Sequence, residues 1–199
     1  MAATPTDTPT RVDHRARLLA GMAASVRAKG FPQTTLADVV REARVSRRTF
    51  YEHFSDPLDC YVALLESIAQ RCNEAIAAAA AGGGTPEERL DRAVGSYLDL
   101  LEADPLLMRS FLRELHLTGE RGRLLLNAVN AQAGALVHAL VEEVRAAEPE
   151  LGLEPIPVDM ARMIVAGIVQ LALMAHDDGQ PLDAVRATAT ALLRRVVAA

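Results

Sequence analysis

Four adjacent residues near position 47 carry side chains that can bond to nucleic-acid bases. They are Ser46, Arg47, Arg48 and Thr49. An arginine can donate two parallel hydrogen bonds to O6 and N7 of guanine, and the hydroxyls can bond bases or adjacent phosphates. Ser46 is also a favoured N-cap, so the two arginines are expected in the first turn of a short helix. Such donors at the start of a short helix indicate a contact in the major groove of DNA.

A second short helix must hold this one in place. Thr35 is predicted to cap it, and Asp38 three residues later suits the partner position of a capping box. Its apolar residues recur at helical spacing at Leu36, Val39, Val40 and Ala43. Thr34 and Thr35 would lie at its N-terminus, where hydroxyls, free amides and the helix dipole favour a phosphate. Two short helices joined by a tight turn predict a helix-turn-helix.

The segment from Arg15 to Tyr61 resembles the DNA-binding domain of the tetracycline-repressor (TetR) family. The matching pieces are Leu18-Leu19, Gly30-Phe31, Thr34 to Val39, Ala43 to Ser46, and Thr49 to Phe54. They form an ordered series over about a quarter of the chain. The sequence departs from the family at Arg44, where glycine is usual, and at Asp56-Pro57, near which a lysine is usual.

The resemblance implies a protein that binds double-stranded DNA. Tyr51 and His53 correspond to positions that hydrogen-bond backbone phosphates. The predicted DNA contacts are Thr34, Thr35, Arg44, Ser46, Arg47, Arg48, Thr49, Tyr51 and His53. Arg44 is expected in a left-handed conformation, either adding a cation near the phosphates or simply tolerated by the turn. The alternative for Tyr51 is packing against the first helix with its hydroxyl in water.

Composition predicts an all-α protein. Half of the 199 residues are apolar, aromatic residues are few, and no alternating β-branched runs occur. We expect about nine helices, forming an N-terminal three-helix helix-turn-helix domain and a larger C-terminal helical domain. The predicted divisions are a disordered arm at 1–10, the DNA-binding domain at 11–60, and the effector-binding and dimerisation domain at 61–199.

No apolar run reaches the roughly 18 residues that a membrane span needs, so no membrane partner is expected. The first ten residues lack the basic and apolar segments of a signal sequence. Cys60 and Cys72 would lie about 18 Å apart on one helix, too far for a disulfide. Two free thiols fit the reducing cytoplasm.

Charge is distributed unevenly along the chain. Residues 1–60 carry nine Lys and Arg against seven Asp and Glu, while residues 61–199 carry twelve against nineteen. A weakly basic patch on an acidic body can bind phosphates locally while the body is repelled. The overall charge of −5 is therefore compatible with a DNA-binding protein.

Residues that are typical of helix starts and helix ends divide the rest of the chain. Gly82 to Gly84 ends a long helix that starts at Pro57. Thr85-Pro86 and Asp104-Pro105 are cap-and-proline helix starts. A break is expected from Gly119 to Gly122, then a helix to Ala147. A linker at 149–157 precedes two final helices, at about 158–175 and 182–198.

These final helices are apolar enough to leave a large exposed patch unless something covers it. The resemblance implies a homodimer in which both helices pair with those of a second subunit. The predicted interface residues are Ile164, Ile168, Leu171, Ala175, Val185, Ala189, Leu192 and Val196. The alternative is that both apolar stripes are buried within one monomer.

Polar residues among apolar ones in the middle helices suggest a small-molecule pocket. The candidate lining is Tyr97, Met108, Phe111, Leu112, His116, Leu126, Asn127, Asn130, Met163 and Gln170. Each polar residue has the alternative of being a satisfied core or interface group. No His-x-x-x-His, Glu-x-x-His or Cys-x-x-Cys pattern occurs, so no metal site, cofactor or enzymatic centre is predicted.

These expectations combine into a one-component transcriptional regulator. A homodimeric repressor would bind a palindromic operator and be released by a small hydrophobic effector. The first alternative is a DNA-binding protein of the same fold without an effector. The second is an all-α enzyme.

Overall fold

The computed structural model describes residues 8–147, 149 and 154–198, with the side chains of 8–13, 86, 87, 116, 194 and 196–198 left out. This part of the chain holds nine α-helices, two short 3-10 helices and no strand, which confirms the predicted all-α fold. In chain order they are α1 (Thr8–Lys29), η1 (Phe31–Gln33), α2 (Leu36–Ala43), α3 (Arg47–Tyr51), α4 (Pro57–Ala81), α5 (Pro86–Ala103), α6 (Pro105–Glu114), η2 (Leu115–Thr118), α7 (Gly119–Ala147), α8 (Val158–Asp177) and α9 (Asp183–Ala198).

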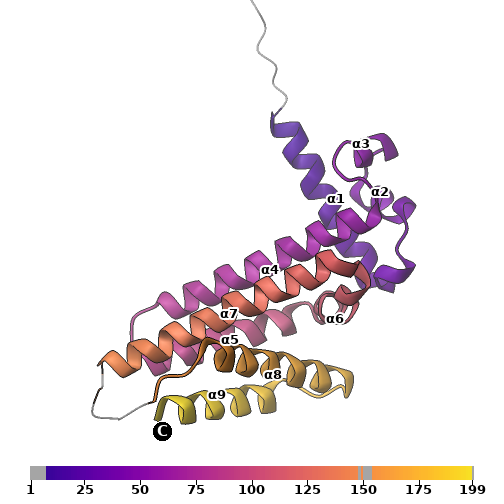
Figure 1. Ribbon diagram of the computed structural model, residues 1–199. Coiled ribbons are helices and arrows are strands. Elements are labelled where there is room, and N and C mark those ends of the chain that lie inside the picture. Colours follow the sequence, from indigo (N-terminus) through magenta and orange to yellow (C-terminus); the bar gives the residue numbers. More distant parts are fainter. Residues whose placement is uncertain (1–7, 148, 150–153, 199) are drawn as a thin grey trace, which may run out of the picture.

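The first three helices and the start of α4 form a small unit, which we call the head (Figure 1). Leu18 and Met22 of α1 meet Val39 of α2 and Phe50 of α3 in a core without solvent exposure. A side chain at Gly21 would come within 2.7 Å of the Val39 carbonyl oxygen. Glycine at this position therefore lets the backbones of α1 and α2 approach closely.

Side-chain caps define the N-terminal ends of α2 and α3, as the sequence predicts. The amide of Thr35 donates to Asp38 Oδ2 at 2.9 Å, and the amide of Asp38 donates back to Thr35 Oγ1 at 3.3 Å. Ser46 Oγ accepts from the amide of Thr49 at 3.0 Å. Between these caps Arg44 adopts φ 52° and ψ 47°, the left-handed conformation expected there.

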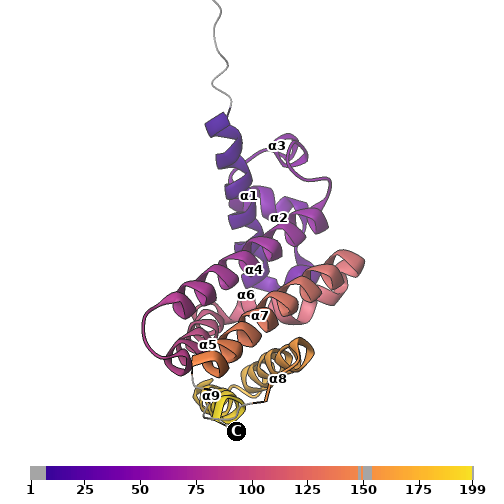
Figure 2. The same cartoon turned by 60° about the vertical axis from the view of Figure 1, so that its left-hand side comes forward.

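The remaining helices form the body. Figures 1 and 2 both show α4, α5 and α7 running alongside one another, with α8 and α9 as an outer layer. Contacts link α7 to α8 and α5 to α9. A side chain at Gly134 would lie 2.6 Å from Cγ of Arg162, so this glycine permits close packing of α7 on α8. One hydrophobic core runs from the head through the body.

The structure changes several predicted boundaries. Residues 8–10 are already helical, and residues 1–7 of the predicted arm lie outside the described part. The predicted domain division at residue 60 falls inside α4, which belongs to both units. Gly122 does not break the chain: α7 starts at Gly119, and Gly122 is buried where a larger residue would collide with Thr118.

By length and composition, α7 and α8 would each pass as a membrane span. The sequence predicts no span because neither contains a long uninterrupted apolar run. In the structure α7 directs Leu140 and Val141, and α8 directs Ile164 and Ile168, into the hydrophobic core. Packing within the chain therefore buries part of the apolar surface of these two helices.

Candidate nucleic-acid interface and cavities

The start of α3 lies at the tip of the head (Figure 1), and its side chains face solvent. Ser46, Arg47 and Arg48 are exposed, whereas Phe50 on the opposite side of the helix is completely buried. Arg48 Nε lies 3.3 Å from Glu52 Oε1, an exposed ion pair that a stronger phosphate or base acceptor can replace. The short helix thus presents two guanidinium groups outward from a rigid apolar anchor.

Tyr51 projects from the same helix. Its ring packs edge-on against Phe50 at 5.6 Å between centroids, and 58% of the residue is exposed. The ring is therefore not buried against α1, which was the alternative to a phosphate contact. His53 is half-buried, with its ring 6.4 Å from that of His14.

The two threonines before α2 have local hydrogen-bond partners. Thr34 is buried and donates to the carbonyl of Gly30 at 2.8 Å, while Thr35 Oγ1 donates to Asp38 Oδ2 at 2.6 Å. A phosphate only accepts hydrogen bonds, and each hydroxyl has a single hydrogen to donate. In this structure both hydroxyls are engaged within the chain, and the amides of the first turn of α2 are the donors left for a phosphate. The contacts of Thr34 and Thr35 with DNA stay a prediction.

The turn between α2 and α3 is held by α1. Arg17 donates to the carbonyl of Arg44 at 2.7 Å, so Arg17 supports the turn, while the Arg44 side chain stays exposed. Arg15 lies over the ring of Phe54, 5.5 Å from its centroid. Asp56, which replaces the usual lysine, caps α4 by accepting from the amide of Asp59 at 2.7 Å.

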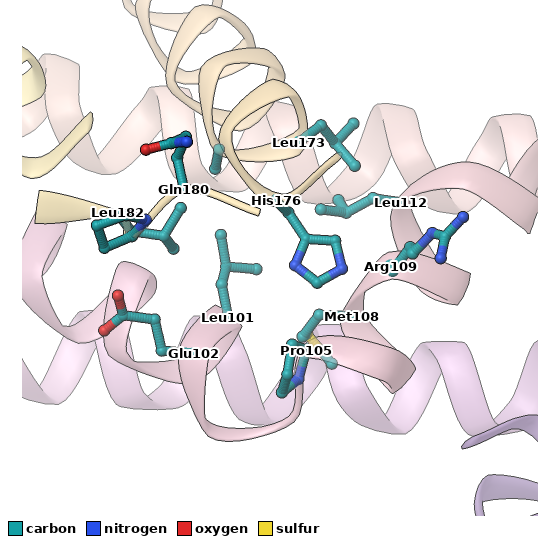
Figure 3. Close-up of a pocket in the computed structure, with 12 residues that line it drawn as sticks. Leu101, Glu102, Pro105, Met108, Arg109, Leu112, Leu173, His176, Gln180 and Leu182 are labelled. Carbon is teal, nitrogen blue, oxygen red and sulfur yellow. The ribbon is translucent and has the colours of Figure 1, made fainter. Parts of the chain in front are cut away.

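Two of the cavities in the described part of the body contain predicted pocket residues. The first, which we call the α5–α8 cavity, has about 190 Å³ and is shown in Figure 3. Its apolar wall includes Leu101, Met108 and Leu112, and its polar groups are Glu102, Arg109, His176 and Gln180. The second, the central cavity, has about 80 Å³ and lies between α4, α5, α7, α8 and α9. Its lining is almost entirely apolar, with Cys72, Asn73, Tyr97 and Asn130 as the polar exceptions.

The hydroxyl of Tyr97 and the thiols of Cys72 and Cys60 stay protonated at neutral pH. Burial raises the pKa of the Tyr97 hydroxyl and of the Cys72 thiol, and it raises the pKa of Cys60 to about 12. Since the thiolate is the nucleophile, neither cysteine is activated for catalysis. Within the described residues no group of three or more His, Cys, Asp or Glu side chains is placed to hold a metal ion.

Comparison with known families decides what the head is. Residues 18–64 match the family of bacterial regulatory proteins called the tetR family. The head therefore matches the N-terminal domain of the tetR family. The match begins in α1 and ends in α4, and it contains the capped α2, the Arg44 turn and the exposed face of α3.

Solved structures share this fold over almost the whole chain. The regulator FadR from Bacillus subtilis, in complex with stearoyl-CoA, is 18% identical, with a TM-score of 0.77 over 91% of this chain and 98% of that chain. FadR from Bacillus halodurans is 20% identical, with a TM-score of 0.75 over 89% and 96%. Reduced NemR from E. coli is 21% identical, with a TM-score of 0.72 over 92% and 97%. No curated protein sequence matches the chain.

The predicted pocket residues divide between several places in the structure. Met108 and Leu112 line the α5–α8 cavity, and Tyr97 and Asn130 line the central cavity. Phe111 is buried in the core and lines neither cavity. Four predicted residues are exposed and line neither cavity, namely Leu126, Asn127, Met163 and Gln170. The side chain of His116 lies outside the described part.

The cavities also contain residues that the sequence analysis missed. Cys72 was predicted only as a free thiol, and Arg109 and His176 were not predicted as pocket residues. Only the packing of α4 on α5, and of α6 on α8, brings these side chains to the cavity walls. The spacing of apolar residues along a helix does not distinguish residues that line a cavity from residues packed in the core.

The predicted dimer interface needs correction. Four of its residues, Ile164, Ile168, Val185 and Ala189, are buried in the core of their own chain. Leu171 and Leu192 are exposed, Ala175 is half-buried, and the side chain of Val196 lies outside the described part. The exposed apolar face of α8 instead carries Met160, Met163, Leu171 and Met174. Because α8 is apolar on two faces, periodicity did not separate the residues that pack within the chain from those that face outward.

Proposed function

We propose that this tetR-family protein is a cytoplasmic one-component repressor that binds a near-palindromic operator as a homodimer and is released by a small hydrophobic or amphipathic effector. The observation that carries this proposal is the exposed start of α3, with Arg47 and Arg48 anchored by the buried Phe50. The same rigid core continues into a body that contains cavities. A DNA-binding end and a ligand-binding end are thereby joined in one chain.

Charge and geometry support the DNA contact. Arg47 and Arg48 reach outward for base edges, while Ser46, Thr49, Tyr51 and His53 lie on or next to α3 for bases or phosphates. Arg44 adds a cation at the turn. Phosphate contacts would set the register of α3 in the groove, and the arginines would supply sequence preference.

The exposed face of α8 supports the homodimer. Met163 is 74% exposed, and Met160, Leu171, Met174 on α8 and Leu192 on α9 are exposed large apolar residues. A second copy of the same face is self-complementary about a two-fold axis. Such a dimer would present two copies of α3 to half-sites about 34 Å apart on one side of the duplex.

The central cavity supports an apolar effector. At about 80 Å³ it is smaller than the 300–1,000 Å³ typical of ligand pockets. Binding would therefore require α4, α5 and α7 to separate, and α4 begins in the head. An effector that favours the separated arrangement would shift the population away from the DNA-bound one. A long acyl thioester such as the stearoyl-CoA bound to B. subtilis FadR is the ligand class to test first.

Selection from random duplex DNA tests the proposal. Purified full-length protein is expected to enrich a palindromic site at near-physiological salt, and Arg47→Ala is expected to weaken binding to that site. Stearoyl-CoA and shorter acyl-CoAs are then added to the complex. Salt-sensitive binding without an enriched site would contradict binding to a specific operator. An enriched site from which no apolar compound releases the protein would contradict release by an effector.

A further inference from the structure

Another hollow lies where the head meets the body. It has about 460 Å³ and lies between the end of α1 and one face of α6. We call it the interdomain crevice. Its charged lining consists of Arg27, Lys29, Arg109, Arg113 and Glu114, four cations against one carboxylate. This excess of positive charge contrasts with the rest of the body, to which α6 belongs, because acidic residues outnumber basic ones there.

Three of the four cations have partners outside the lining. Arg27 pairs with Asp104 at 2.6 Å, Lys29 pairs with Asp38 at 2.6 Å, and Arg113 pairs with Asp177. The side chains of Arg27 and Arg113 remain 44% exposed. An arginine has five N–H donors, and these pairs leave some of them available.

Arg109 is different. It is exposed, and in the part of the chain that the structure describes it makes no hydrogen bond or ion pair. Figure 3 shows its guanidinium at one end of the α5–α8 cavity, beyond His176. Arg109 therefore lines both hollows, with a mostly apolar wall on one side and a cationic wall on the other.

The single carboxylate of the crevice is already engaged. Glu114 Oε2 accepts the hydroxyl hydrogen of Ser110 and the amide hydrogen of Phe31. These bonds hold the carboxylate against the wall at Gly30 instead of leaving it to pair with Arg109 or Arg113. An incoming anion would thus meet the guanidinium group of Arg109 together with three cations whose acidic partners lie outside the crevice.

We propose that the interdomain crevice binds a multiply charged phosphate group, with Arg109 as the central contact. A guanidinium matches two phosphate oxygens at once, and several guanidinium groups around one hollow suit a group with more than one negative charge. The crevice is distinct from the DNA-binding surface, because Figure 1 shows α3 at the tip of the head and the end of α1 beside α6.

Such a phosphate can be free, or it can be the head of an amphipathic molecule whose apolar part enters the α5–α8 cavity through the shared Arg109. The second form rests on the proposed function, and the first does not. In both forms the anion bridges α1 of the head and α6 of the body. Binding therefore stabilises the arrangement of the two units in this structure.

Titration calorimetry with sodium pyrophosphate at constant ionic strength tests the site without DNA. Wild-type protein is expected to bind, and Arg109→Gln is expected to bind about tenfold more weakly, since hydrogen bonds between charged groups are the strong ones. Arg71→Gln is the matched control, because Arg71 is exposed on α4 and bonds only the Ser67 carbonyl of its own helix. Absence of binding, or equal binding by Arg109→Gln, would overturn the proposal.

Methyl phosphate and decyl phosphate distinguish the two sources. If decyl phosphate binds more tightly, and Leu173→Trp or Leu112→Phe in the cavity removes the difference, the crevice holds the head of an amphipathic effector. Equal binding of both, with loss in Arg109→Gln, identifies a free-anion site. If the anion binds but DNA selection shows no enriched site, the proposed repressor function fails and the crevice site stands.

Discussion

The carboxylate of Glu114 accepts a hydrogen bond from the backbone amide of Phe31, with 3.0 Å between Oε2 and N. Glu114 ends α6 in the body, and Phe31 follows α1 in the head. The ring of Phe31 also stacks on Tyr61 of α4 at 3.9 Å, and the Tyr61 hydroxyl lies 2.8 Å from Oγ of Ser110. Two units of the chain are thus joined by a polar and aromatic contact rather than by apolar packing alone.

Glu114→Ala is expected to lower the free energy of unfolding by about 1–2 kcal/mol, because the Phe31 amide and the Ser110 hydroxyl lose their acceptor. Glu114→Gln keeps an acceptor oxygen and should lose less. Urea denaturation measures the difference. Glu66→Ala, on the exposed side of α4, is the control and should change stability by less than about 0.5 kcal/mol. Equal losses for Glu66→Ala and Glu114→Ala would contradict the assigned contact.

Arg47→Ala and Arg48→Ala are each expected to weaken binding to the selected operator by about 1–3 kcal/mol if the arginine pairs with a guanine. Their unfolding curves should stay unchanged, since both side chains are exposed. Fluorescence anisotropy with a labelled duplex measures the affinity. Arg71→Ala serves as the control for the lost charge. Unaltered affinity in both variants would remove them from the DNA-contact set.

Arg44→Gly separates backbone strain from charge at the turn. Glycine tolerates φ 52° without a side-chain clash, so the variant should be more stable by up to about 1 kcal/mol. If the Arg44 side chain also contacts a phosphate, the slope of log K against log salt should fall by about 0.9. Thermal melts and salt titrations measure the two effects. A stabilised variant with an unchanged slope would show that the turn merely tolerates arginine.

Asp38 links stability to pH. Hydrogen bonds from Lys29 and then Thr35 hold the pKa of Asp38 well below its usual range. A carboxyl group with a depressed folded-state pKa stabilises the protein fully above its unfolded pKa of about 3.9, and that stabilisation is lost as the pH falls toward the folded value. The melting-temperature advantage of wild type over Asp38→Asn should therefore be constant from pH 7 to 5 and shrink below about pH 4. An advantage that persists unchanged to pH 3 would argue against this linkage.

Leu171→Glu is expected to dissociate the proposed homodimer, because it places a charge in the middle of the exposed apolar face of α8. Sedimentation velocity should then show a monomer that melts cooperatively. Leu124→Glu is the matched control, since Leu124 is also an exposed leucine but lies on α7. A wild-type protein that sediments as a monomer at micromolar concentration would refute the dimer.

Local patterns predicted the helices because each signal acts over only a few residues. The capping box of Thr35 and Asp38 and the N-cap at Ser46 are both present, and the left-handed turn at Arg44 follows from the chain's need to reverse there. These features depend on hydrogen bonds within one turn of backbone. They could be predicted without knowing where any other helix lies.

The sequence by itself therefore determined the helical fold, the helix-turn-helix and the outward arginines of α3. Only the tertiary structure decided which face of α8 is buried, because that helix is apolar on both faces and its neighbours select one. The tertiary structure likewise decided that Arg109 lies between two hollows and that the Thr34 hydroxyl donates to the carbonyl of Gly30. Helix periodicity carries information along one element. The meeting of α1 with α6, or of α5 with α8, depends on packing between residues far apart in the chain.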